Sequence, residues 1–402
     1  NPTFTGITRG IGGFGFGVAA AAAAEEDSEQ QLDYFITTLN RSVSDYDLCY
    51  GVAVGSDDSI YGCGGGYGAG GDPVDRSGTG VIFKLSPNGV LQWQREIQIG
   101  GTWNDIILDS NDNVYVCGDW NGGVGSGQNQ HAVLVKLNSS GTTQWIRSLT
   151  ESSNNSNNQN FIRTSSLAVD SSGYIIMMGY IIGNATAGQS AWISKWDSSG
   201  SLQWSKIYNR SGNSITGSGV ITDSSNNIFI CGQGRVQNNY YNQPFVGKLD
   251  SSGNPQWYSA IIGPYDATYG NTHLRANFGS LAFDYDEDNI YAFGRGNRGA
   301  GPGTQTDLFT VKYNSSGVIQ WHKFTGTDGF ESGYDIAVDD ELEDGKIYVV
   351  GDFVNSPNNY TSGSIVEFDK DTNFRYRRSL RSFGLNDPSG VGLYMIGGIV
   401  MD

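Results

Sequence analysis

Apolar and polar positions alternate in short runs along most of the chain, and these runs recur as fixed phrases. Each unit opens with an apolar run that ends in Asp, such as SLAVD at 166–170 and DIAVD at 335–339. A turn of Ser, Asn, Asp or Gly follows, and then a β-branched and aromatic run such as YIIMMG at 174–179. Short runs of this kind, bounded by turn residues, are typical of strands, so the two runs predict a β-hairpin.

The second half of each unit predicts two more strands. A variable Gly/Asn-rich stretch leads to a third apolar run, such as AWISKW at 191–196, and a polar turn then leads to a fourth, such as LQWSKIY at 202–208. In five units the turn contains a glycine, which supplies a positive φ at low cost. The fourth run carries an aromatic residue at one fixed place: Trp93, Trp145, Trp204, Trp257, Trp321 and, in a degraded sixth copy, Tyr376.

Four antiparallel strands per repeat predict an all-β fold, a β-propeller whose blades pack radially around a channel. Six units are complete, at roughly 49–98, 103–150, 164–208, 215–260, 276–325 and 333–380. On an outer strand, each tryptophan would present a large flat surface to the next blade, which predicts a structural, blade-docking role.

The two ends of the chain hold partial strand phrases, DYFITTLN at 33–40 and GLYMIGG at 392–398. We expect a seventh blade assembled from both termini, because this arrangement closes the ring and leaves no free sheet edge. A six-bladed ring with stray end strands is the alternative. On this interpretation residues 33–402 form the propeller and residues 1–32 form a separate Gly/Ala-rich arm.

The phrases LAVDSSGYIIMMG at 167–179 and AWISKWDSSGSLQW at 191–204 resemble the SBBP-type repeats of seven-bladed β-propellers in bacterial surface and secreted proteins. The resemblance extends over residues 49–380. It implies the blade scaffold and very little about activity. The last unit departs most, since Arg375 and Tyr376 replace its Gln-Trp pair.

Composition narrows the choice of partner. The formal net charge of -17 repels phosphate backbones, and no Lys/Arg cluster overrides it, so nucleic acid is not an expected partner.

Three of the four cysteines, Cys63, Cys117 and Cys231, stand where other units have Met, Phe or Val. A position that accepts such residues needs an apolar filler, which predicts core packing.

Enzymatic signatures are missing from the sequence. The three histidines, His131, His273 and His322, are best interpreted as surface or inter-strand residues, and no G-x-S-x-G, H-E-x-x-H or P-loop motif occurs. The D-S-S-G-x-x-x-W phrase is similar to the tryptophan-docking motif of quinoprotein dehydrogenases, which bind pyrroloquinoline quinone and calcium. The vicinal Cys-Cys of those enzymes is absent. We therefore expect a protein that is not an enzyme and carries no cofactor.

Two kinds of sequence segment are candidates for binding a ligand or a partner. DYDEDN places Asp284, Asp286 and Asp288 at alternate positions, as calcium would require, although Asp and Asn are also common turn residues and the turn interpretation is favoured. The Tyr/Asn-rich stretches at 232–244 and 351–363 suit contacts with carbohydrate or protein, or serve as soluble filler; both interpretations stay open.

The first 24 residues contain one charge, Arg9, and end in six alanines. A signal peptide lacks its basic start here, and a membrane span would be too short. A third interpretation is an assembly arm with a short Ala-rich helix, whose apolar residues are buried against other subunits: Ile7, Ile11, Phe14 and Phe16. A chain that starts at Asn1 without Met is expected to have been processed or trimmed.

This layout resembles that of phage virion fibre and decoration proteins. The resemblance implies a structural or display subunit of a virion or extracellular surface, attached through residues 1–32. A secreted or cell-surface propeller that binds glycan or protein is the alternative, and a quinoprotein-like enzyme is the third interpretation.

Overall fold

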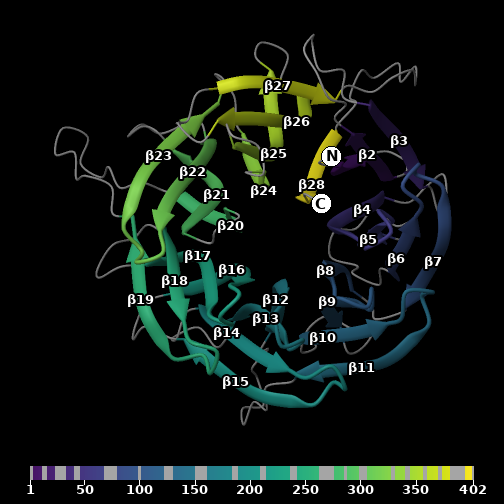
Figure 1. The fold of residues 1–402 in the computed structure, drawn as a ribbon, viewed down its shortest axis with the longest axis horizontal. Coiled ribbons are helices and arrows are strands. Elements are labelled where there is room, and N and C mark those ends of the chain that lie inside the picture. Colours follow the sequence, from purple (N-terminus) through teal and green to yellow (C-terminus); the bar gives the residue numbers. More distant parts are fainter. Residues whose placement is uncertain are drawn as a thin grey trace.

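The computed structural model of the chain describes residues 3–10, 16–22, 33–39, 46–67, 79–97, 101–121, 130–149, 161–182, 189–208, 214–235, 242–261, 276–284, 288–297, 306–326, 331–339, 345–355, 360–369, 374–380 and 394–400. All of the elements in these ranges are strands or turns. Strands β4 to β27 form six antiparallel sheets of four consecutive strands each, arranged around a common centre (Figure 1). We number them blade 1 to blade 6 in chain order.

The strands of blades 1 to 3 are β4 (Tyr46–Val54), β5 (Ile60–Tyr67), β6 (Thr79–Leu85) and β7 (Leu91–Ile97); β8 (Trp103–Leu108), β9 (Val114–Asn121), β10 (Gln130–Leu137) and β11 (Thr143–Leu149); and β12 (Phe161–Val169), β13 (Ile175–Ile182), β14 (Gln189–Trp196) and β15 (Leu202–Tyr208). Those of blades 4 to 6 are β16 (Ile215–Thr222), β17 (Ile228–Arg235), β18 (Asn242–Leu249) and β19 (Pro255–Ala260); β20 (Ala276–Phe283), β21 (Asn289–Asn297), β22 (Thr306–Asn314) and β23 (Ile319–Thr325); and β24 (Ser332–Asp339), β25 (Lys346–Asn355), β26 (Tyr360–Asp369) and β27 (Phe374–Leu380). The first strand of each blade is innermost and the fourth is outermost (Figure 1). The predicted all-β propeller is confirmed, with six blades built from consecutive strands.

Both ends of the chain contribute to one further sheet, which we call the closing sheet. Its order is β28 (Tyr394–Val400), β1 (Thr3–Gly10), β2 (Phe16–Ala22) and β3 (Asp33–Leu39), and all its pairs are antiparallel. Strand β28 contacts β24 and β25 of blade 6, and β1 and β28 both contact β4 of blade 1. The closing sheet therefore lies between the last blade and the first (Figure 1).

Residues 1–32 differ in two respects from the expected arm. The helix expected at the alanines is wrong, because Ala19–Ala22 belong to β2 and pair with β1 on one side and β3 on the other. Strands β1 and β2 also lie between the two terminal phrases that were expected to share a sheet. Alanine favours a helix in isolation, but cross-strand pairing overrides such a local preference.

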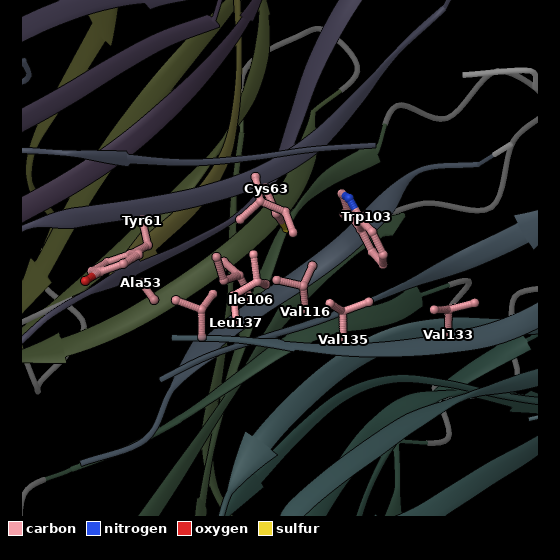
Figure 2. Close-up of a cluster of buried hydrophobic side chains, with 11 residues drawn as sticks. Ala53, Tyr61, Cys63, Trp103, Ile106, Val116, Val133, Val135 and Leu137 are labelled. Atoms are coloured by element: carbon pink, nitrogen blue, oxygen red, sulfur yellow. The ribbon is translucent and has the colours of Figure 1, made fainter. Parts of the chain in front are cut away.

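The hydrophobic core is divided among the junctions between blades. One cluster joins blades 1 and 2 and contains Tyr61, Trp103 and Val135, all fully or almost fully buried (Figure 2). Equivalent clusters join each later pair of blades up to blades 5 and 6. Because each blade buries its faces against its neighbours, no single blade has a complete core by itself.

The four cysteines are free and buried within this core. Burial raises the pKa of the Cys63 and Cys117 thiols well above the ordinary value, so these side chains stay neutral and pack as small apolar groups. The predicted packing role is consistent with this placement.

Candidate functional site

The inner strand of every blade contains a β-bulge at the same place. In blade 2, for example, the pairing of β8 with β9 steps from Trp103 to Asp105 and leaves Asn104 unpaired. The residues left out of the register in blades 1 to 6 are Tyr50, Asn104, Ser165, Ser218, Gly279 and Tyr334. A bulge bends its strand and redirects the side chains beside it, and bulges of this kind are common next to functional sites.

The residue that follows the bulge makes contact with the next blade, and we call it the junction position. Asp105 accepts a hydrogen bond at Oδ2 from the amide of Leu167 in blade 3, at 2.7 Å. Ser166 accepts one at Oγ from the amide of Val220 in blade 4, at 3.3 Å. Each of these bonds crosses from one inner strand to the next around the wall of the ring.

The remaining junction positions use other chemistry. The Ser280 hydroxyl of blade 5 donates a hydrogen bond to Asp335 Oδ1 of blade 6. At Gly51 and Gly219 there is no room for a side chain; a Cβ on Gly51 would lie 3.0 Å from the backbone of Asp105 in the next blade. The junction position is therefore glycine where blades approach closely and polar elsewhere.

Two of the junction residues are carboxylates that influence each other. Burial raises the pKa of Asp105 to about 7, and the negative charge of Asp335 adds to this effect, although hydrogen bonds from the Leu167 and Ile106 amides oppose it. Asp105 lies in blade 2 and Asp335 in blade 6, two blades on opposite sides of the closing sheet and blade 1. A half-buried carboxyl group that titrates near neutral pH can exchange protons under physiological conditions.

A second polar cluster lies where β9 ends, at the edge of the ring that carries the connections between second and third strands. We call this the long-loop edge. Asp119 is 8% exposed and accepts a hydrogen bond from the amide of Thr164 in blade 3, at 2.8 Å. The Asn104 side chain donates to both the carbonyl and hydroxyl oxygens of Thr164, at 2.9 Å. Burial raises the pKa of Asp119, while these bonds and the charge of Arg163 lower it.

Next to Asp119 on the same strand lies Trp120, a large aromatic residue with 39% of its surface accessible. It pairs with His131 of β10, and the two ring centroids are 5.5 Å apart with a 47° interplanar angle. Burial lowers the pKa of His131, which favours the neutral imidazole. The pair forms an aromatic surface at the long-loop edge, which the sequence analysis did not identify.

The repeated tryptophans lie on the outer strands and contact the next blade. Trp93 Nε1 donates to the carbonyl of Ser139 at 3.1 Å, and Trp145 and Trp257 make the same bond to the turns of blades 3 and 5. Each ring lies against the positive-φ glycine of that turn: a Cβ on Gly141 would come within 2.8 Å of Trp93. Trp204 packs against Gly253 in the same way. Trp321 packs against the core between blades 5 and 6, and the side chain of Tyr376 lies outside the described residues.

The carboxylates proposed for calcium are arranged as turn residues where they are described. Asp284 accepts hydrogen bonds from the backbone and side-chain amides of Asn289, which closes the hairpin. Asp288 is exposed, and Asp286 lies outside the described residues. Over the part of the chain that the structure describes, no group of three or more His, Cys, Asp or Glu side chains is placed to hold a metal ion.

The residues proposed for an assembly arm are only partly described. Ile7 and Phe16 belong to β1 and β2, where the backbone alone is placed, and Ile11 and Phe14 lie outside the described residues. Attachment to other subunits through residues 1–32, and a location on a virion or extracellular surface, remain predictions. Among the described residues there is no helix long and apolar enough to span a membrane.

Fold and blade junctions together define the class of the protein as a β-propeller. Residues 203–240 match the family model of the SBBP beta-propeller repeat. This match confirms, for one stretch, the resemblance that the recurring phrases indicated. No curated protein matches the sequence.

Several solved structures are similar to this chain at low sequence identity, and one of them has a TM-score above 0.5. The periplasmic gluconolactonase of Pseudomonas aeruginosa is 12% identical, with a TM-score of 0.60 and coverage of 99% of both chains. Prolyl oligopeptidase B of Galerina marginata is 12% identical, with a TM-score of 0.49; the match covers 95% of this chain and 52% of that one. A NanB sialidase mutant of Streptococcus pneumoniae is 10% identical, with a TM-score of 0.48 and coverage of 95% and 88%.

These comparisons correct one expectation from the sequence. The chain was expected not to be an enzyme, and that expectation is wrong: the gluconolactonase, whose fold matches over 99% of this chain, is itself an enzyme. The reason is physical. One fold hosts many functions, and the same chemistry recurs on unrelated folds, so the absence of a familiar sequence motif does not exclude catalysis. At this level of identity, the comparison shows the shared fold and not a shared reaction.

Proposed function

We propose that the protein is a carbohydrate-binding propeller whose ligand lies on the long-loop edge, against Trp120 and His131. The observation that carries this proposal is the exposed, paired aromatic surface of these two residues. Indole and imidazole faces stack on the apolar face of a sugar ring, while nearby polar groups bond to its hydroxyls.

Comparison between blades supports a binding role for Trp120. The equivalent position in blade 3 is Ile181, which is 8% exposed and belongs to the core between blades 2 and 3. In blades 4 and 5 it is Gly234 and Gly296. Blade 6 has Phe353 at this place. Because glycine and a buried isoleucine also occur there, blade packing does not require an exposed indole.

The polar residues beside this surface support the same ligand class. Asp119, Asn104 and Thr164 hold one another through hydrogen bonds between blades 2 and 3, which keeps the backbone next to Trp120 in a defined position. Binding sites built on a rigid scaffold lose less entropy when the ligand binds. The Tyr/Asn-rich stretches predicted for contact leave the second strands of blades 4 and 6 at the same edge.

The test is a glycan array of the full chain, followed by titration of the best oligosaccharide with Trp fluorescence. Trp120→Ala is expected to weaken binding about tenfold, because truncation of a central aromatic contact costs more than about 1 kcal/mol of binding free energy. The matched control is Tyr258→Ala, which removes an aromatic residue that is 51% exposed on the outer strand of blade 4. Equal binding by the wild type and Trp120→Ala would overturn the proposal.

We also propose that the closing sheet acts as a seventh blade that closes the ring. The order of its strands, with β28 innermost and β3 outermost, and its contacts with blades 6 and 1 support this role. Deleting residues 390–402 removes β28, and it is expected to lower the melting temperature by many degrees because two sheet edges are exposed. An unchanged melting curve would show that the six blades are stable without closure.

A further inference from the structure

A row of three side chains crosses the second, third and fourth strands of each blade at the same register. In blade 1 the row is Tyr61, Lys84 and Trp93, with Lys84 opposite both aromatic residues. Five blades place a lysine at the centre: Lys84, Lys136, Lys195, Lys248 and Lys312. This central residue is positioned next to the turn that follows the inner strand.

In three blades the central ammonium group pairs with a carboxylate of that turn. Lys195 Nζ lies 2.7 Å from Asp170 Oδ2, and both side chains are at least nine-tenths buried. The pairs of blades 1 and 4 measure 3.3 and 3.7 Å. A buried carboxylate is stable only when an opposite charge or hydrogen bonds replace its lost hydration, and here the lysine supplies the charge.

Blade 6 replaces the central lysine with Glu367. The pairing of Tyr348 with Glu367 and with Ala337 matches that of Ile176 with Lys195 and Ala168 in blade 3. Because Asp339 follows Ala337 at the same spacing as Asp170 follows Ala168, Asp339 and Glu367 occupy the places of the Asp170–Lys195 pair. Two carboxylates thus share a site that holds an ion pair in blade 3.

These carboxylates are buried to the same degree as that ion pair. Glu367 is 3% exposed and Asp339 is 7% exposed. The Oε2 atom of Glu367 is buried and has no hydrogen-bond partner among the described residues. Lys346 lies opposite Asp339 in the register and contributes one positive charge, which leaves the three side chains with a net charge of about one negative unit.

We propose that a hard metal cation of the calcium class binds between Glu367 and Asp339, at the place of the missing ammonium group. Glutamate has a shorter side chain than lysine, and the Glu367 carboxylate is buried at the same register position. Both side chains offer oxygen donors, which calcium prefers, and water or main-chain oxygens complete the coordination. The cation neutralises the acid pair and ties the third strand of blade 6 to the turn after its first strand.

The experiment measures the melting temperature of the full chain after chelation and then at increasing calcium concentration. Wild type is expected to gain several degrees with calcium, because a ligand that binds only the native state stabilises it. Glu367→Gln is expected to lose this gain. Glu367→Lys restores the ion pair of the other blades, and it is expected to melt near the calcium-loaded wild type with no response to calcium.

The matched control is Asp288→Asn, which removes an exposed carboxylate from an acidic turn of blade 5. It is expected to keep the calcium response, and so distinguishes the proposed site from general binding to an acidic protein. Three outcomes would overturn the proposal: no response of the wild type to calcium, a full response in Glu367→Gln, or a full response in Glu367→Lys.

Discussion

The outer rim and the inner wall of the ring join the same blades by different means. At the rim, a tryptophan of one blade packs against the positive-φ glycine in the turn of the next, with its Nε1 bonded to a turn carbonyl in three junctions. At the inner wall, the residue after each bulge makes the contact, and it is glycine, aspartate or serine in different blades. The residue that makes the contact is thus repeated at the rim and varies at the inner wall.

This difference shows that the rim contact and the inner-wall contact place different requirements on the sequence of the repeat. The rim contact needs one ring and one glycine, so a fixed phrase satisfies it in blade after blade. At the inner wall each junction residue faces a different set of neighbours in the next blade. Different residue types can therefore occupy this position, provided that each makes a contact between the two blades. The rim therefore stabilises each blade junction through the same kind of contact. The junction residues of the inner wall differ from blade to blade in charge and in pKa.

The largest expected effect is at the rim. Trp204→Ala should lower the free energy of unfolding by about 3 kcal/mol, the lower end for removal of a large aromatic residue, because this ring is only half-buried. Urea unfolding measures the change. Val318→Ala, at a position that is 56% exposed, serves as the control and should change stability by less than about 0.5 kcal/mol. Similar values for both would show that the rim contact contributes little.

A second rim experiment separates backbone conformation from packing. Gly253 has φ of 76°, and a Cβ there would lie 2.9 Å from the Trp204 ring; Gly173 has φ of 78° with nothing within 4 Å. Gly173→Ala should cost about 1 kcal/mol for its left-handed backbone alone, and Gly253→Ala about 2 kcal/mol. Melting temperatures of the two variants provide the comparison. An equal loss would mean that the ring moves aside freely.

At the inner wall, the effect should depend on pH. The pKa of Asp105 is about 7 in the native state against an ordinary value of 3.8, so the native state binds more protons between these values. The free energy of unfolding should therefore fall as pH rises from about 4 to about 7 and stay level above that. We expect a fall of about 1.5 kcal/mol, less than the full pKa difference implies, because the carboxyl group is only half-buried. Asp105→Asn should remove this part of the slope, and urea unfolding at pH 5 and pH 8 tests it; an unchanged slope would contradict the assignment.

The smallest effect is expected at the junction of blades 5 and 6. Ser280→Ala removes the hydroxyl that bonds to Asp335 and should cost about 1 kcal/mol. Ser218→Ala, at the bulged position of blade 4, is the control and should be close to neutral. If the two variants have the same stability, the Ser280–Asp335 hydrogen bond does not contribute to stability. The stability of the blade junctions would then depend still more on the tryptophan contacts at the rim.

The sequence predicted the features that depend on repetition. The blade ranges agree with the structure within a few residues, and the tryptophans lie on outer strands, because a four-strand phrase with a turn glycine leaves few alternatives. The binding and metal residues were harder to identify. Trp120 is outside the repeated phrase, and Glu367 is distinctive only when its register is aligned with Lys195 in another blade.

The inner-wall bulges could not be predicted, because they arise from the meeting of two blades and not from a local pattern. Asp105 and Ser166 stand in runs that read simply as strands. Strands β1 and β2 were missed for a related reason: glycine and alanine carry little strand preference, and these residues become strands only when β3 and β28 are beside them.

The order of strands in the closing sheet has a consequence for biosynthesis. Strand β1 is translated before the other described strands, yet its partner in the closing sheet is β28, which is translated after all of them. While the ribosome makes the intervening blades, one edge of β1 lacks its final neighbour and can pair with other chains. Chaperone binding at this edge, or rapid synthesis of the chain through β28, would then control how much of the newly made protein reaches the native state.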